Sequence, residues 1–316
     1  MTKIAVPLDG SPLAECVLPH VLTLARVFEA GVKLIQVIEQ PRLACRGPGI
    51  DPLDWQLCKA QSRRYLEDQA ERLEHEGLTT EVVLLEGDPA QEIVGHVRED
   101  EQITLIVMSS HGQNGLSGWN ISSVVQKILV RVSITAFIVR AFQTAEQDHA
   151  SYPRILVALD GSQRAEIALP FAQRLAAAQS ADLVLAHIVP RPEMPRRTPL
   201  SANEVQLSEQ LVDRNRDEAR QYLEVLQARA GEHVVTRLVV GDQVAERLHE
   251  IVREEEIALV VLSAHGYSGP RRRPFGSIAQ DFIEFGETAL LLVQDLPREA
   301  LLQSPAELAV HQQQGH

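Results

Sequence analysis

The chain has 316 residues, 45% of them hydrophobic, which is enough for two domains of about 150 residues, each with a core of its own. A formal net charge of −13 and a pI near 5.3 argue against a nucleic-acid-binding protein, since such proteins need a concentrated basic surface. No apolar stretch approaches the roughly 20 residues that cross a bilayer, and Cys16, Cys45 and Cys58 form no CxxC pair, so we expect a soluble cytoplasmic protein without a disulfide framework or zinc site.

The first half of the chain predicts alternating strands and helices. Its apolar runs, which we expect to be strands, are residues 4–8, 32–38, 81–85, 103–108 and 134–140, with segments of helical periodicity between them. Runs without polar alternation are buried on both faces, which is typical of a parallel sheet covered by helices. Ser11 should cap the first helix and Pro12 should begin it, whereas Pro19 should kink or break it.

The second half repeats the first. Asp9 returns as Asp160 after 151 residues, and His111 returns as His265 after 154. The strands expected here are residues 154–159, 182–189, 234–240, 257–262 and 288–293. A period this long indicates two complete folds rather than a solenoid. We therefore predict an α/β protein of two tandem doubly wound domains with five-stranded parallel sheets, at residues 1–142 and 152–297, followed by a C-terminal tail at 298–316.

The connections between these elements are interpreted as structural. Residues 143–153 form a short linker, and the Pro-rich segments 41–52 and 190–199 read as surface loops. Gly87-Asp88-Pro89-Ala90 predicts a tight turn from the third strand into a helix that begins at Pro89.

Ligands of an open parallel sheet bind beyond the carboxyl ends of its strands, where the strand order reverses. Two motifs fall there: Asp160-Gly161-Ser162 after one strand, and Ser263-x-x-Gly266-x9-Gly276-Ser277 after another. Small residues let backbone N–H groups approach an anion, and a helix that begins at Gly276-Ser277 adds its partial positive charge. The pattern predicts a phosphate site, although an aspartate at such a turn also serves as an ordinary helix cap.

The motifs resemble those of the universal stress proteins, in a tandem form that covers the chain to about residue 297. The shared features are a strand that ends in Asp-Gly-Ser, an Ala-Glu-x-x-Leu-Pro helix, Gly-Asp-Pro-Ala and Ser-x-His-Gly. The resemblance implies a Rossmann-like fold of the adenine nucleotide alpha hydrolase kind, and ATP as the ligand, with Mg²⁺ as its companion ion. It also implies the motif G-x-x-G-x9-G-[S/T], whose glycines line the phosphates. The aspartate after the first strand then faces the adenosine, and the end of the second strand meets the adenine.

Carried over to this sequence, the resemblance implies one better preserved site and one degenerate site. In the second half the implied nucleotide-binding residues are Asp160, Gly161, Ser162, Ile188, Val189, Ser263, His265, Gly266, Gly276 and Ser277. In the first half they are Asp9, Ser109, Gly112, Ser122 and Ser123, so the middle glycine of the motif is kept there. Because a serine side chain takes space and restricts positive φ, we expect nucleotide binding mainly in the second half.

Two further features bear on the site. Arg271-Arg272-Arg273 lies between Gly266 and Gly276, where arginine suits phosphate oxygens or forms a solvated loop. His111 and His265 cannot be assigned a nucleophile with an acidic partner, so we interpret them as packing or backbone-bonding residues.

We therefore expect a universal stress protein that acts as a sensor in stress adaptation by binding an adenine nucleotide and that is not an enzyme. Weak ATP hydrolysis is one alternative, although the sequence shows no evident water-orienting base or carboxylate pair for magnesium. A second alternative is a scaffold with two degenerate sites that acts through protein contacts. The resemblance also implies pairing through the last strands, residues 136–140 and 289–293, as a pseudo-dimer within the chain, or a homodimer of chains.

Overall fold

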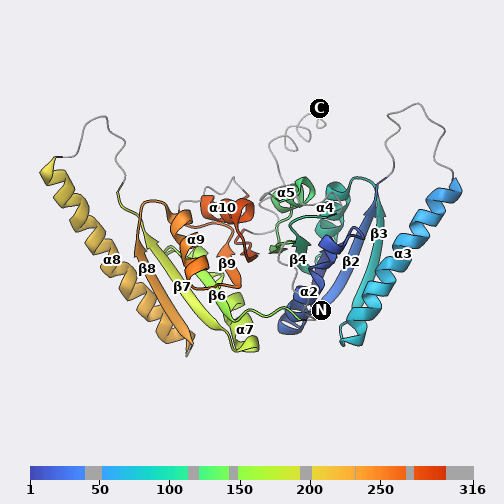
Figure 1. Ribbon diagram of the computed structural model, residues 1–316, viewed down its shortest axis with the longest axis horizontal. Coiled ribbons are helices and arrows are strands. Elements are labelled where there is room, and N and C mark those ends of the chain that lie inside the picture. The colour runs from blue at the N-terminus through green and yellow to red at the C-terminus, as the bar shows by residue number, and fades with distance from the viewer. Residues whose placement is uncertain are drawn as a thin grey trace, which may run out of the picture. The chain divides into compact units, whose positions relative to one another are not determined.

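The computed structural model describes residues 1–39, 52–112, 121–141, 149–192, 201–231, 233–267 and 274–296. It divides into two compact units, which we call the first domain, built on Met1–Ala150, and the second domain, Ser151–Asp295 (Figure 1). Among the described residues, no helix is long and apolar enough to cross a membrane.

The first domain alternates strands and helices as predicted. Its elements are β1 (Lys3–Pro7), α1 (Pro12–Glu15), α2 (Leu18–Phe28), β2 (Gly31–Ile38), α3 (Pro52–His75), β3 (Thr80–Glu86), α4 (Pro89–Glu99), β4 (Ile103–Ser109), α5 (Ser123–Arg131) and β5 (Thr135–Val139).

The second domain repeats this order. Its elements are β6 (Arg154–Leu159), α6 (Gln163–Glu166), α7 (Leu169–Gln179), β7 (Asp182–Val189), α8 (Ala202–Ala230), β8 (Val234–Val240), α9 (Val244–Glu254), β9 (Leu259–Ser263), α10 (Ser277–Phe285) and β10 (Ala289–Val293).

Each domain has five parallel strands, which confirms the predicted fold class (Figure 1). Their order is β3-β2-β1-β4-β5 in the first domain and β8-β7-β6-β9-β10 in the second. The central strand β6 is apolar because both of its faces are covered, and Ile155, Leu156 and Val157 are fully buried. The chain order reverses between β6 and β9, so the carboxyl ends of these two strands form the switch point of the second domain.

The helices of the second domain cover its sheet in two layers (Figure 1). From β6 the chain moves through β7 to β8, and it then returns to β9 and β10 on the other side. Right-handed crossovers therefore place α7 and α8 on one face and α9 and α10 on the other. The first turns of α9 and α10 consequently begin near the carboxyl ends of the strands.

The first helix of each domain is interrupted, as its proline predicts. Ser11 and Ser162 cap α1 and α6, since each hydroxyl accepts a hydrogen bond of 3.1 Å from the amide three residues later. Each short helix ends after one turn, and the following helix begins just before its proline, Pro19 or Pro170. The prolines thus lie in a first turn, where a missing N–H group costs nothing.

A cluster of charged side chains joins α9 to two strands of the second domain. Glu255, the C-cap residue of α9, pairs with Arg154 at 2.5 Å and also with Arg237 of β8. Arg154 begins β6, so this cluster lies near the amino end of that strand, opposite the switch point.

One connection differs from the prediction. Tyr152, assigned to the linker, has 1% of its surface exposed, and its amide donates a hydrogen bond of 2.6 Å to Gln179 of α7. It is therefore a buried residue of the second domain, fixed to α7 through its backbone amide. Most of the predicted loops, residues 41–52 and 190–199, and the tail 298–316 lie outside the described residues.

Candidate functional site

The turn after β6 is shaped by a side chain that bonds its own backbone. Gly161 has φ +81°, a conformation that favours glycine, and it turns the chain directly into α6. Asp160 Oδ1 accepts hydrogen bonds from the Ser162 amide at 3.0 Å and the Ser162 hydroxyl at 2.6 Å. Ser162 in turn caps α6, so the three residues of the predicted motif form one hydrogen-bonded unit.

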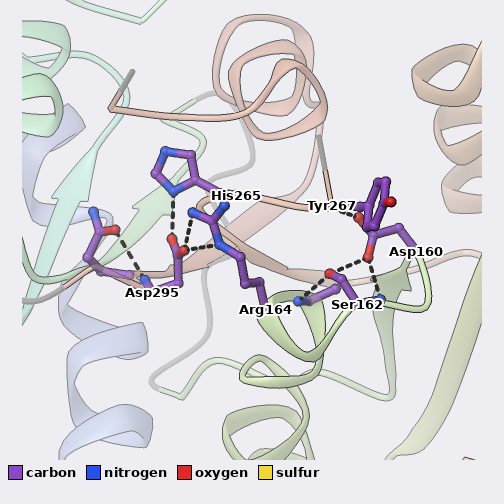
Figure 2. A network of polar contacts seen from close by, with 8 residues as sticks. Asp160, Ser162, Arg164, His265, Tyr267 and Asp295 are labelled. Carbon is purple, nitrogen blue, oxygen red and sulfur yellow. Dashed lines mark hydrogen bonds and ion pairs between the residues drawn. The ribbon is translucent and has the colours of Figure 1, made fainter. Parts of the chain in front are cut away.

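Asp160 also reaches the loop that follows β9. Its Oδ2 accepts a hydrogen bond of 2.6 Å from the Tyr267 amide (Figure 2). A Cβ atom added to Gly266 would overlap this oxygen, and a Cβ atom on Gly112 would overlap Asp9 Oδ2 in the same way. The middle glycine of the motif therefore has a structural reason to be present in both domains, because the aspartate carboxylate lies against it.

A cavity of about 110 Å³ opens at the switch point of the second domain. Its lining comes from the ends of β6 and β9, from α6, from the first turns of α9 and α10, and from the loop between β9 and α10: Ala158, Leu159, Asp160, Ala165, Val244, Leu248, Leu262, Ser263, Ala264, His265, Gly266, Gly276, Ser277, Ile278 and Ala279. Pockets for whole drug-sized ligands measure roughly 300–1,000 Å³, so this cavity is large enough for only part of such a ligand.

The N-terminus of α10 is open toward this cavity. Gly276 is its N-cap residue and offers no side chain to the first N–H groups, and the first turn of α10 carries no acidic residue. In the first domain the corresponding Ser122 caps α5 itself, since its hydroxyl accepts a hydrogen bond of 3.3 Å from the Val125 amide. An uncapped helix N-terminus attracts anions, and a capped one has used part of that capacity.

We expected a serine in place of a motif glycine to be unfavourable because the glycine position would need a positive φ, and for Ser122 this expectation is wrong. Ser122 has φ −63° and Gly276 has φ −73°, and both are extended backbone that any residue adopts. Their amides also make the same bond, to the carbonyl of Ser110 or Ala264 at 2.8 Å. The two domains therefore differ here in the cap that the serine hydroxyl provides, and not in backbone shape.

Ser263 lines the cavity with an unsatisfied hydroxyl. The residue is 9% exposed, and its buried Oγ has no hydrogen-bond partner among the described residues. The matching Ser109 Oγ accepts hydrogen bonds from Cys16 Sγ at 3.5 Å and from the His111 amide at 3.4 Å. A buried polar atom without a partner is costly, so the hydroxyl of Ser263 is suited to a polar ligand.

His265 belongs to a charged network that sequence reasoning missed (Figure 2). Its Nδ1 lies 2.6 Å from Asp295 Oδ1, while Arg164 of α6 binds Asp295 Oδ2 through Nε at 2.6 Å and Nη2 at 2.5 Å. Burial would raise the pKa of the Asp295 carboxyl, but the bonds from His265 and Arg164 outweigh burial and hold that pKa below its usual range. The available signal in the sequence was Asp295 itself, an acidic residue two positions after the end of β10.

The structure brings together part of the predicted residue set. Asp160, Ser263, His265, Gly266, Gly276 and Ser277 all line the cavity. Four predicted residues are outside its lining: Gly161, Ser162, Ile188 and Val189. The last two lie in β7, where they pair with β8, and the Val189 carbonyl also accepts a hydrogen bond of 3.1 Å from the Gly241 amide.

The predicted residues of the first domain also have structural roles. Asp9 bonds Ser11 as Asp160 bonds Ser162, and Ser123 begins α5. Arg271-Arg272-Arg273 lies outside the described residues.

Comparison with known proteins identifies both domains. The family model described as the universal stress protein family matches residues 1–140 and again residues 151–294. A universal stress protein of Mycobacterium tuberculosis is 23% identical over 305 residues, which cover 92% of this chain and 96% of that relative. A universal stress protein of Methanocaldococcus jannaschii is 29% identical over 139 residues, which cover 44% of this chain and 81% of that relative.

Solved structures show the same tandem architecture. A putative universal stress protein of Pseudomonas aeruginosa matches with a TM-score of 0.67 at 17% identity and covers 95% of each chain. A universal stress protein of Archaeoglobus fulgidus matches with a TM-score of 0.63 at 18% identity, covering 92% of this chain and 98% of that one. At these identities the likeness concerns the fold.

Proposed function

This chain belongs to the universal stress protein family, with two copies of the family's domain in tandem, and we propose that it binds ATP or another adenine nucleotide mainly in its second domain. We further propose that this binding serves stress adaptation, with the protein acting as a sensor. The observation that carries the proposal is the open N-terminus of α10 beside the unsatisfied hydroxyl of Ser263. Both line one cavity at the switch point of the sheet.

The phosphates would lie at the start of α10. Backbone N–H groups of Ser277, Ile278 and Ala279 have no partner within the helix, because the first turn of any α-helix lacks preceding carbonyls. These three residues line the cavity, and the helix dipole there favours negative charge. The Ser263 hydroxyl supplies one further hydrogen bond.

Asp160 would contact the sugar end of the nucleotide. A carboxylate accepts about four hydrogen bonds. Asp160 accepts three within the described residues, two from Ser162 and one from Tyr267. One acceptor position on a residue that lines the cavity therefore suits a ribose hydroxyl.

The proposal is binding rather than catalysis. The side chain of His265, which could otherwise serve as a base, is 0% exposed and bonded to Asp295. Within the described part of the chain, no three His, Cys, Asp or Glu residues gather in an arrangement that could hold a metal ion. The polar groups at the cavity support a ligand that is held and released unchanged.

Mass spectrometry of small molecules released from the protein, purified without added nucleotide, tests the proposal. We expect an adenine nucleotide in the released fraction, or saturable binding when ATP is added to emptied protein. Absence of nucleotide together with no binding at millimolar ATP would refute the proposal and leave the alternative of a scaffold that acts through protein contacts.

A further inference from the structure

We propose that Asp295 is a positioning residue for the nucleotide site: together with Arg164 it holds His265, and through His265 it fixes the backbone that lines the cavity. The inference rests on the proposed function for its consequence on ligand affinity. Its structural part, the fixing of the loop after β9, is independent of any ligand.

The network is built so that a buried charge is compensated. The side chain of Asp295 is 3% exposed and that of His265 is 0% exposed. Asp295 uses one carboxylate oxygen for His265 and the other for Arg164, so both oxygens are engaged (Figure 2). A buried carboxylate is retained in a fold when it is paired and hydrogen-bonded in this way.

The network acts on the cavity through the neighbours of His265. Ala264 and Gly266 flank it in the chain, and all three residues line the cavity. The Ala264 carbonyl accepts the Gly276 amide at 2.8 Å, and the Ala264 amide donates to the Val293 carbonyl at 2.8 Å. A displaced imidazole would therefore shift the segment that sets the start of α10.

The segment of residues 264–267 is also held at its second end, Tyr267. The Tyr267 amide bonds Asp160, which precedes α6, and Arg164 lies within α6. Asp160 thus holds Tyr267 directly, and Arg164 supports His265 through Asp295, so the two sides of Gly266 are both held (Figure 2). This arrangement restricts the conformation of residues 264–267 before a ligand arrives, which lowers the entropic cost of binding.

The first domain fixes its histidine in a different way. Leu13 and Ala141 occupy the positions of Arg164 and Asp295. His111 Nδ1 instead lies 3.0 Å from Ser110 Oγ, which also accepts the Ala141 amide at 3.2 Å. The charged network is therefore found in the second domain, where α10 is uncapped. The first-domain residues at the same positions provide the substitutions for a test.

The test compares Asp295→Ala with two further variants, a double variant and a control. Asp295→Ala introduces the alanine that the first domain has at this position. A double variant adds Ala264→Ser, which supplies a hydroxyl at the position from which Ser110 contacts His111. Glu255→Ala is the control, because it breaks a similar ion-pair cluster of the same domain at the opposite end of the sheet. The full-length chain is used throughout, with ATP as the probe, and amide hydrogen exchange is measured without ligand.

We expect Asp295→Ala to raise amide exchange at Gly266, Tyr267 and Gly276 and to weaken ATP binding, each by about tenfold, as befits the loss of a charge-assisted hydrogen bond. Ala264→Ser should recover part of both losses. Glu255→Ala should lower the melting temperature and leave loop exchange and ATP affinity unchanged.

Unchanged loop exchange in Asp295→Ala, or an equal increase in Glu255→Ala, overturns the inference. Should Asp295→Ala fail to fold, Asp295→Asn is used, because it keeps an acceptor for His265 and loses the charge that pairs with Arg164; it is judged by the same exchange criterion. A wild-type chain that binds no ATP refutes the proposed function, while the exchange data still decide whether Asp295 positions the loop.

Discussion

Asp160 and Gly266 are coupled residues, and their coupling recurs in the first domain as Asp9 and Gly112. In each pair a carboxylate oxygen occupies the space that a side chain on the glycine would need. The motif resemblance assigns these glycines to phosphate binding, but the first domain keeps its glycine beside a self-capped helix. Part of the motif is therefore maintained by the fold itself.

Replacing Gly266 with alanine should destabilise the protein by about 1–3 kcal/mol, the usual cost of overpacking a filled site. The new methyl group would displace the Asp160 carboxylate and break its bond to the Tyr267 amide. Gly276→Ala is the control, because a Cβ atom there lies 3.6 Å from its nearest neighbours. Urea unfolding measures both, and equal stabilities of the two variants would contradict this account.

Ser263 and Ser109 should respond oppositely to alanine. Ser263→Ala removes a buried hydroxyl that lacks a partner, so the ligand-free protein should keep its stability or gain up to about 1 kcal/mol. Ser109→Ala removes an acceptor for the His111 amide and should destabilise by about 1 kcal/mol. Thermal unfolding with and without ATP checks this, and Ser263→Ala should lose part of the stabilisation by ATP. A loss of ligand-free stability at Ser263 would show that its hydroxyl is already bonded.

Acid should weaken the protein through Glu255. Hydrogen bonds from Arg237 and Arg154 hold the pKa of Glu255 below its ordinary value, against the effect of burial. Because the folded pKa is the lower one, the stabilisation is complete above the unfolded pKa of about 4.3 and is lost as pH falls through the folded value.

The free energy of unfolding, measured in urea from about pH 6 down to about pH 3, should therefore fall less steeply in Glu255→Gln than in the wild type. Identical slopes in the two proteins would mean that Glu255 has the same pKa in the folded and unfolded chains.

At the scale of elements, α10 and α5 show how two related helices diverge. Both begin at the same place with the same backbone bond, and they differ in whether the N-cap residue has a hydroxyl. A serine hydroxyl at this position competes with an anion for the first N–H groups. The hydroxymethyl group of the N-cap residue thus decides whether the helix start is capped or open.

Capping α10 should weaken ATP binding in the second domain, whereas removing the cap of α5 should not affect that site. Gly276→Ser should cap α10 and weaken ATP binding by about tenfold, with a change in stability of only a few tenths of a kcal/mol. Ser122→Gly should leave binding in the second domain unchanged. Calorimetric titration measures the affinities. Wild-type affinity in Gly276→Ser would show that the open start of α10 does not contribute to ATP binding.

The sequence was sufficient to predict the strands and several of the helix starts. Short apolar runs located the strands, and Ser11, Pro89 and Gly276 marked helix starts as found. The role of Asp295 could not be predicted, because the carboxylate meets Arg164 across 131 residues and that distance depends on the packed fold. Tyr152 was assigned to the linker for a related reason. The polar residues that precede it in the sequence do not reveal that its side chain is buried in the fold.

For the whole molecule, the duplication preserved the fold more fully than the site. Both domains keep the parallel sheet, the interrupted first helix and the aspartate–glycine contact. The second domain adds an uncapped α10, an unsatisfied Ser263 and the Asp295 network at one cavity. We therefore expect the two domains to differ in ligand binding while remaining alike in architecture.

The most direct test of this asymmetry is the stoichiometry of ATP binding to the full-length chain, measured by calorimetric titration of nucleotide-free protein. We predict one site per chain, weakened by Gly276→Ser and unaffected by Ser122→Gly. Two equivalent sites per chain, or one site that persists in Gly276→Ser and is altered by changes at Ser122, would contradict it.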